Sequence, residues 1–169
     1  MKTLLFTLSL FATTFVFPGE AFPVSALPSL WVAGERPTNW AKGELYIIEC
    51  WASWCGPCMQ VIPHIEQLWQ TLKSEQVHVI GVNVGERHTP EAIRALLAKQ
   101  TTPPTYALAA DHGNNLKRYL KFTGIPFAVV VRDGEVIWRG HPARLTVRLL
   151  RSLKNPIPTT VPQSPAKFK

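Results

Sequence analysis

The chain has 169 residues, of which 46% are hydrophobic and 17% charged, and this balance is typical of one compact globular domain. Its 18 Lys and Arg against 11 Asp and Glu give a formal net charge of +7, with the basic residues scattered along the chain. This composition excludes a disordered or fibrous protein, and we expect no nucleic-acid partner. A weak attraction to acidic partners or anionic lipid surfaces stays open.

The N-terminal stretch has the layout of a secretory signal. Lys2 precedes an apolar run at 4–17, and Ala21 and Ala26 are placed for cleavage after them. The run is shorter than the ~20 residues that span a bilayer, so we expect removal of 1–26 rather than a membrane anchor. The protein is therefore expected to be exported, to the periplasm or another extracytoplasmic space, where disulfides persist.

The remaining elements indicate an α/β fold with a central mixed β-sheet flanked by helices on both faces. After an irregular entry, a strand, a helix and a second strand follow within about 40 residues, which indicates a parallel βαβ unit. The expected strands are 45–50, 77–84, 106–109 and a 127–138 hairpin turning at Asp133-Gly134, with helices from 56, from Pro90, to Lys121 and around Leu145, Leu149, Leu150 and Leu153. The domain is expected to cover 27–153, with a Pro-rich disordered tail at 154–169.

Cys55 and Cys58 are the residues that indicate most about the function of this chain. Cys55 stands where a strand gives way to a helix, and Pro57 suits a first helical turn because no partner exists there for the N–H that proline lacks. The free backbone N–H groups and the positive end of the helix dipole favour an anion, which for a cysteine is the thiolate. We therefore predict a redox pair with a solvent-accessible nucleophile, Cys55, and a resolving thiol, Cys58.

Two simpler interpretations of the pair are disfavoured. A zinc site usually has four ligands, and the chain has no second Cys-x-x-Cys or spaced His pair. A purely structural disulfide across three residues closes a small loop and gains little chain entropy.

The motif resembles the thioredoxin superfamily, and most closely its TlpA/ResA-type extracytoplasmic branch. The residues that carry this resemblance are Trp51-Ala52-Ser53-Trp54-Cys55-Gly56-Pro57-Cys58, Pro63, and Gly124-Ile125-Pro126. The resemblance implies a thioredoxin-like domain and a cis Pro126 that faces the cysteines, with the Ile125 backbone pairing with a substrate chain. Trp54, Gly56 and Pro57 complete the expected substrate-binding set, and Trp51 is expected in the core.

Glu49 is a candidate catalytic residue. It stands six residues before Cys55, where thioredoxin has a buried aspartate, so the resemblance implies proton exchange with Cys58. Burial would raise its pKa, whereas a glutamate at a strand end could also simply reach solvent. Cys50 should point to the opposite face of the strand and serve as a small buried hydrophobe.

The resulting prediction is an enzyme that exchanges thiols and disulfides and reduces disulfides in partner proteins. We expect it to use no metal and no cofactor beyond the Cys55–Cys58 disulfide. Gly-Pro between the cysteines resembles reducing members of the superfamily; TlpA/ResA relatives reduce cysteines in partners such as apocytochromes, which implies a membrane electron donor. We expect a monomer.

The alternatives are a disulfide oxidant or isomerase, and a copper-delivery module that uses the cysteines and a loop histidine. A thiol peroxidase is disfavoured because its reactive cysteine would be unpaired.

Overall fold

The structure is a computed structural model that describes residues 19–155. The predicted signal at 1–26 and the predicted tail at 154–169 therefore lie mostly outside the described residues and stay predictions.

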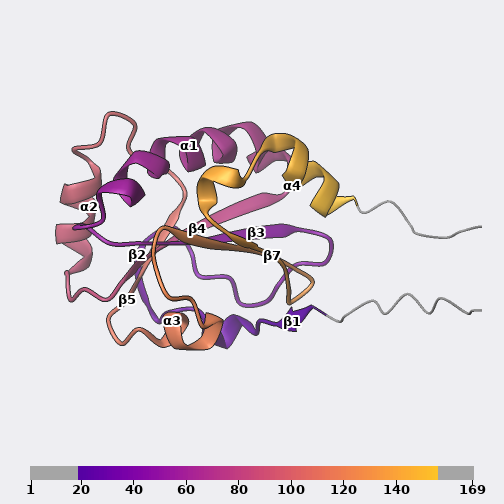
Figure 1. The fold of residues 1–169 in the computed structure, drawn as a ribbon, viewed down its shortest axis with the longest axis horizontal. Coiled ribbons are helices and arrows are strands. Elements are labelled where there is room, and N and C mark those ends of the chain that lie inside the picture. The colour runs from indigo at the N-terminus through magenta and orange to yellow at the C-terminus, as the bar shows by residue number, and fades with distance from the viewer. Residues whose placement is uncertain (1–18, 156–169) are drawn as a thin grey trace, which may run out of the picture.

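The described residues form a seven-stranded mixed sheet with the strand order β1-β7-β6-β3-β4-β5-β2 (Figure 1). The strands are β1 (Glu20–Ala21), β2 (Leu30–Ala33), β3 (Leu45–Trp51), β4 (Val77–Val84), β5 (Ala107–Asp111), β6 (Phe127–Arg132) and β7 (Glu135–Gly140). β3, β4 and β5 are parallel neighbours, while β6 runs antiparallel to β3. The predicted parallel unit and the predicted hairpin are both confirmed.

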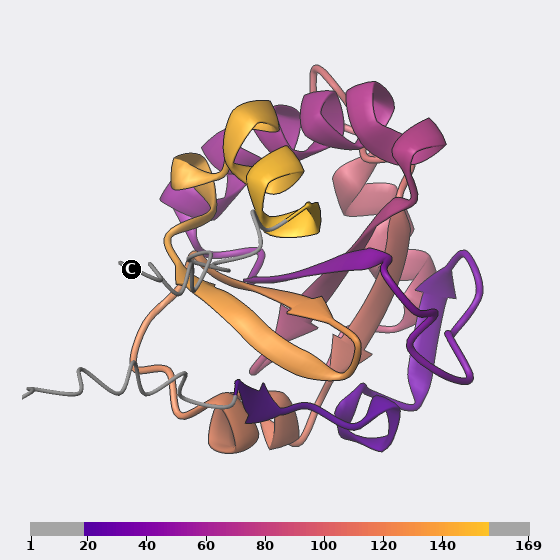
Figure 2. The ribbon, with the colours of Figure 1, turned by 90° about the vertical axis from the view of Figure 1, so that its right-hand side faces the viewer.

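Helices cover both faces of the sheet. They are α1 (Gly56–Leu72), α2 (Pro90–Leu97), α3 (Asn115–Leu120) and α4 (Val147–Lys154). α1 and α4 lie over one face and α3 lies against the other (Figures 1 and 2). α1 continues unbroken through Pro63. Across residues 19–155, the helices are too short or too polar to cross a membrane.

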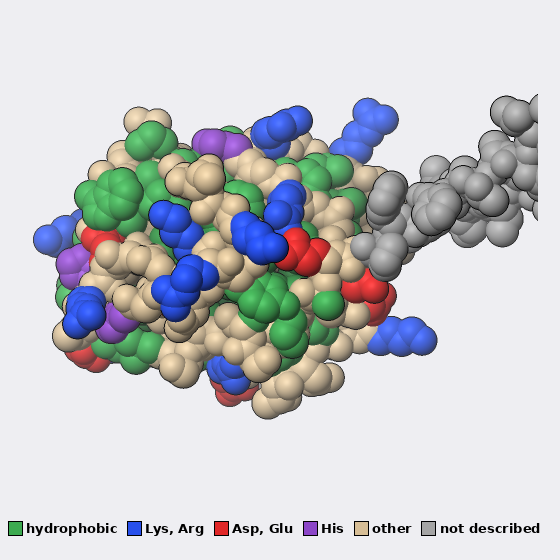
Figure 3. Space-filling view, turned by 60° about the horizontal axis from the view of Figure 1, so that its bottom comes forward, with side chains coloured by type: hydrophobic (Ala, Val, Ile, Leu, Met, Phe, Trp, Pro, Cys, Tyr) green, Lys and Arg blue, Asp and Glu red, His purple; other side chains and the backbone are tan. Residues whose placement is uncertain are grey.

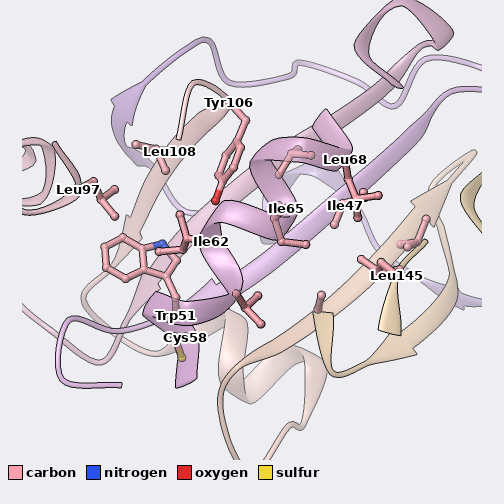
Figure 4. Packing of buried hydrophobic residues seen from close by; sticks show 14 of the residues in the cluster. Ile47, Trp51, Cys58, Ile62, Ile65, Leu68, Leu97, Tyr106, Leu108 and Leu145 are labelled. Carbon is pink, nitrogen blue, oxygen red and sulfur yellow. The ribbon is translucent and has the colours of Figure 1, made fainter. Parts of the chain in front are cut away.

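β3 is the central strand of the core, and all seven of its residues are buried. Because successive side chains point to opposite faces, Ile47 and Trp51 face the cluster under α1, which also includes Ile62, Ile65 and Cys58 (Figure 4). Ile48 and Cys50 face the second cluster, which packs against α3. Because both faces of β3 are buried, its sequence is largely apolar and does not alternate between apolar and polar residues.

The segment that precedes β3 contains more regular structure than the sequence indicates. Residues 28–43 were expected to be irregular, yet Leu30–Ala33 form β2, which pairs antiparallel with β5 at the edge of the sheet. The expectation was wrong because a four-residue strand is too short to show an alternating pattern, and its partner lies about 80 residues away in sequence.

Phe22 anchors the N-terminal segment to the domain. Its side chain is fully buried, its N–H donates to the Gly134 carbonyl at 2.7 Å, and its carbonyl accepts from Trp40 Nε1 at 2.5 Å. The Tyr119 hydroxyl donates to the Ala21 carbonyl at 2.9 Å. Cleavage after Ala26 would remove these contacts, so we propose that processing leaves Phe22 in the mature chain.

Replacing Phe22 with Ala should lower the free energy of unfolding by about 3–5 kcal/mol, because a buried aromatic side chain leaves a cavity in a packed cluster. Urea titration of both proteins measures this difference. Ser25→Ala, an exposed change in the same segment, is the control and should stay within about 0.5 kcal/mol. An equally small effect of Phe22→Ala would show that this segment is not part of the folded domain.

Candidate active site

The cysteine pair lies at the carboxyl end of β3 and the amino end of α1. Cys55 is the N-cap of α1, and its Sγ accepts the Cys58 N–H at a distance of 3.2 Å. The two residues form a disulfide with an S–S distance of 2.04 Å, and Pro57 occupies the first turn of the helix. The predicted placement of a thiol against free helix N–H groups is therefore confirmed.

The two sulfur-bearing residues are both shielded in this disulfide form. Cys55 is 4% exposed and Cys58 is 0% exposed, so the expectation that Cys55 is open to solvent was wrong for the oxidised state. The difference arises because Cys55 packs in the cluster under α1 and is bonded to Cys58, which is fully buried. Trp54, by contrast, is 72% exposed, and Trp51 is buried at 1%, as expected.

Pro126 lies beside the end of β3. The Ile125–Pro126 peptide bond is cis, as the resemblance implied. Phe127, the next residue, is in register with Cys50 across the β3–β6 pair, which places this turn next to the loop that carries the cysteines. Ile125 and Trp54 line one hollow of about 470 Å³. The structure thus brings together two members of the expected substrate-binding set.

Glu49 is fully buried in the sheet. By alternation it shares the α1 side of β3 with Trp51, and neither of its carboxylate oxygens has a hydrogen-bond partner among the described residues. Its register partner on β4 is Gly81, and a Cβ built there would lie 2.9 Å from Tyr106 Cε2. The Tyr106 ring therefore fills the space beside Glu49 that a larger residue on β4 would take.

Burial raises the pKa of Glu49 from 4.5 to about 8. The cause is desolvation, which disfavours the charged form of a carboxyl group with no donor to stabilise it. Because the folded state holds this proton and the unfolded state releases it near pH 4.5, Glu49 stabilises the fold at low pH. That contribution is lost as the pH rises from about 4.5 to about 8.

Cys50 lies on the opposite face of β3 from Glu49, as predicted. It is a free thiol, fully buried in the cluster next to α3. Burial raises its pKa, and the nearby charges of Glu49 and Asp111 raise it further. A neutral thiol without solvent contact is unreactive, so the hydrophobic interpretation fits this environment.

Glu86 holds the loop before Cys55, and the sequence analysis missed it. Its carboxylate accepts the Ser53 N–H at 2.6 Å and the Asn83 side-chain N–H at 2.6 Å, and it also accepts the Ser53 hydroxyl. These hydrogen bonds lower the pKa of Glu86 and outweigh the opposing effect of partial burial. His88 Nε2 lies 3.2 Å from the same carboxylate.

A signal for this cluster was present in the sequence. Asn83 and Glu86 come at and just beyond the end of β4, and the ends of parallel neighbouring strands meet at one edge of the sheet. The position of that edge relative to Ser53 depends on the register of β3 against β4, where Trp51 pairs with Asn83.

Three other histidines lie within hydrogen-bonding distance of neighbouring groups. His64 Nε2 lies 3.0 Å from the Leu145 carbonyl, His78 Nε2 lies 2.7 Å from Glu44, and His141 caps a short helical turn at 142–144. Within residues 19–155, no group of three His, Cys, Asp or Glu side chains is arranged to hold a metal ion.

The fold and the cysteine site together define a thioredoxin-like protein. A family model described as thioredoxin-like matches residues 43–136, and the chain belongs to this family.

Named relatives support the likeness to the TlpA/ResA-type branch. The thiol:disulfide interchange protein HelX of Rhodobacter capsulatus is 34% identical over 92 residues, which cover 54% of this chain and 48% of HelX. The thiol-disulfide oxidoreductase ResA of Geobacillus thermodenitrificans is 30% identical over 73 residues, which cover 43% of this chain and 41% of ResA. The chain thus matches under half the length of these two relatives.

A solved structure confirms the fold. The thiol:disulfide interchange protein, a thioredoxin family protein from Chlorobium tepidum TLS, superposes with a TM-score of 0.63 at 23% sequence identity. The likeness covers 80% of this chain and 97% of that one.

Replacing Glu86 with Ala should raise the rate at which Cys55 reacts with iodoacetamide after reduction by about 2–3-fold at pH 6, because a lower pKa raises the thiolate fraction while it weakens each thiolate as a nucleophile. Removing a carboxylate from the loop takes away a negative charge that opposes the thiolate and releases the Ser53 backbone, so the Cys55 pKa should fall by about half to one unit. Exposed Glu91→Ala is the matched control and should leave the rate unchanged. Equal rates for both variants would show that Glu86 does not influence Cys55.

Proposed function

We propose that this protein is an extracytoplasmic thiol-disulfide oxidoreductase that reduces disulfides in partner proteins. The observation that carries the proposal is the Cys55–Cys58 disulfide at the amino end of α1, beside the exposed Trp54. The names of the relatives HelX and ResA support the same chemistry.

The proposed reaction begins with the reduced pair. The Cys55 thiolate attacks one sulfur of a substrate disulfide, forms a mixed disulfide and expels the other substrate sulfur as a thiolate, which takes up a proton. Cys58 then attacks Cys55 Sγ, the enzyme disulfide forms and the second substrate thiol leaves. Two electrons and two protons pass to the substrate, and a donor must return them to the enzyme.

The helix amino terminus supports the first step. The N–H of Cys58, which points at Cys55 Sγ, would stabilise the thiolate both as nucleophile and as leaving group. Trp54 would contact the substrate chain with its exposed indole, and Gly56 and Pro57 leave room for that chain because neither carries a long side chain. Ile125, which precedes the cis bond, would pair with the substrate through its backbone.

We propose that Glu49 accepts the proton that Cys58 loses in the second step. Cys58 must lose its proton before it attacks, and Glu49 lies on the same face of the sheet with no competing hydrogen bond among the described residues. A carboxyl group with a pKa of about 8 is partly ionised near neutral pH, so it can accept that proton and later return it.

The location and partners are part of the same proposal. The basic residue and apolar run at the N-terminus support export, and an exported reductase needs a membrane electron donor because its surroundings favour disulfides. We propose a monomer that acts on protein thiols and disulfides and requires no cofactor beyond its own cysteines.

The reduction potential of the Cys55–Cys58 pair tests this function and its direction. Equilibration against dithiothreitol or glutathione should give a potential near about −270 mV, the value of a dedicated reductant. A potential near about −120 mV would instead identify a disulfide oxidant and contradict the reductase. The Cys58→Ser variant is the control; it should form no intramolecular disulfide and should retain glutathione on Cys55 as a stable mixed disulfide.

Replacing Glu49 with Gln should remove a pH dependence of stability. Wild-type protein should lose up to about 5 kcal/mol of unfolding free energy between pH 4.5 and pH 8, because 1 pKa unit corresponds to about 1.4 kcal/mol. The variant cannot titrate there and should show a flat profile in denaturant titrations at these pH values. Glu135→Gln, an exposed change, should keep the wild-type slope.

The same variant tests the proton-transfer role. At pH 7, release of substrate from the Cys55 mixed disulfide should slow by at least about 10-fold, since a positioned general base typically contributes more than that. Initial attack by Cys55 should change much less. An unchanged release rate across neutral pH would dismiss Glu49 from the mechanism.

A further inference from the structure

A hollow of about 470 Å³ adjoins the redox site on the side of α3. It lies between the loop after β4 and the segment that leads into β6, and Trp54 forms one wall. Besides Trp54, its lining includes Val84, Asn114, Lys117, Phe122, Thr123 and Ile125. Since Trp54 precedes Cys55 directly, a chain bound to Cys55 can extend into this hollow.

The lining is apolar in its depth and polar at its rim. Val84 and Phe122 are buried, at 4% and 7% exposure, and Ile125 is half-buried, so these side chains form the apolar part. Asn114, Thr123 and Lys117 supply the polar groups. Such a surface suits one apolar side chain of a peptide, with polar neighbours that remain near water.

Lys117 gives the rim a positive charge that no described residue neutralises. It is exposed on α3, and its side chain makes no ion pair with residues 19–155. Lys and Arg side chains spread over the face of the molecule that carries α3 (Figure 3).

The acidic residues nearest in sequence to this rim are engaged elsewhere. The Asp111 carboxylate is buried and accepts the backbone N–H groups of Asn115 and Leu116 at 3.0 and 2.8 Å. The Glu86 carboxylate is held by Ser53 and Asn83. Neither carboxylate is free to pair with Lys117, so an incoming anion would meet an uncompensated cation.

We propose that this hollow selects substrates in which the reactive cysteine is flanked by an apolar side chain and an acidic residue, with Lys117 as the specificity-determining cation. This inference rests on the proposed oxidoreductase activity and adds the chemistry of its partner. The apolar side chain enters between Trp54 and Phe122, and the substrate carboxylate pairs with the Lys117 ammonium at the rim.

Two short synthetic peptides provide the test. Each carries one cysteine in a mixed disulfide with thionitrobenzoate and a neighbouring leucine; one has two aspartates beyond the leucine and the other has two lysines. Attack by pre-reduced protein displaces thionitrobenzoate from the peptide sulfur, and Cys58 then releases the peptide thiol, so no added reductant is needed. Absorbance of the released thionitrobenzoate gives the second-order rate constant.

The acidic peptide should react about 5-fold faster than the basic peptide at low salt, because one partly exposed ion pair contributes a factor of this size. Raising the salt concentration to about 0.5 M should reduce this ratio by screening the charges. Lys117→Glu should bring the ratio to about 1 or below.

Lys42→Glu is the matched control for overall charge. Lys42 is exposed in the turn before β3, at the opposite end of that strand from Cys55, and its replacement changes the net charge by the same amount. It should retain most of the wild-type preference. Equal ratios in the two variants would show that net charge alone attracts acidic peptides and would overturn the assignment to Lys117.

Failure of this inference is distinguishable from failure of the proposed function. If the wild-type protein reacts with both peptides at the same rate, Lys117 selects nothing and the oxidoreductase activity stands. If neither peptide releases thionitrobenzoate beyond the Cys55→Ser background, both the function and this inference fail.

Discussion

The parallel pairing of β3 with β4 is the constraint on which the site depends. Both faces of β3 are buried, so a shift of one residue would exchange the side chains that pack under α1 with those that pack against α3 and disrupt both clusters. In this register Trp51 lies opposite Asn83, so the loop that follows β3 meets the residues that follow β4. Ser53 can then bind Glu86, and Cys55 is held at the start of α1.

Two buried groups near the disulfide, Cys55 and Glu49, have opposite electrostatic surroundings. Cys55 lies at a helix terminus whose N–H groups favour a negative charge, whereas Glu49 lies among apolar groups that favour the neutral form. They come from different elements: Glu49 lies within β3, and Cys55 lies after the end of β3, at the start of α1. In the mechanism that we propose, Glu49 holds a proton while the negative charge develops on Cys55.

The proposed substrate-binding surface lies on a different part of the fold. Trp54 projects from the loop, and the hollow beside it is completed by α3 and the segment before β6, which come from the second half of the chain. In this proposal the chemistry of the cysteines is separate from the choice of partner, which depends on residues such as Lys117.

The sequence by itself determined the helices, the long strands, the hairpin and the position of the cysteine pair, because these depend on local periodicity and on turn and helix-start residues. It also separated Glu49 from Cys50, since alternation along a strand is a local property. Only the tertiary structure decided the short edge strand β2, the burial of Phe22, the shielding of Cys55 and the contact of Glu86 with Ser53. Each of these joins segments distant in sequence, and their meeting depends on strand order and register.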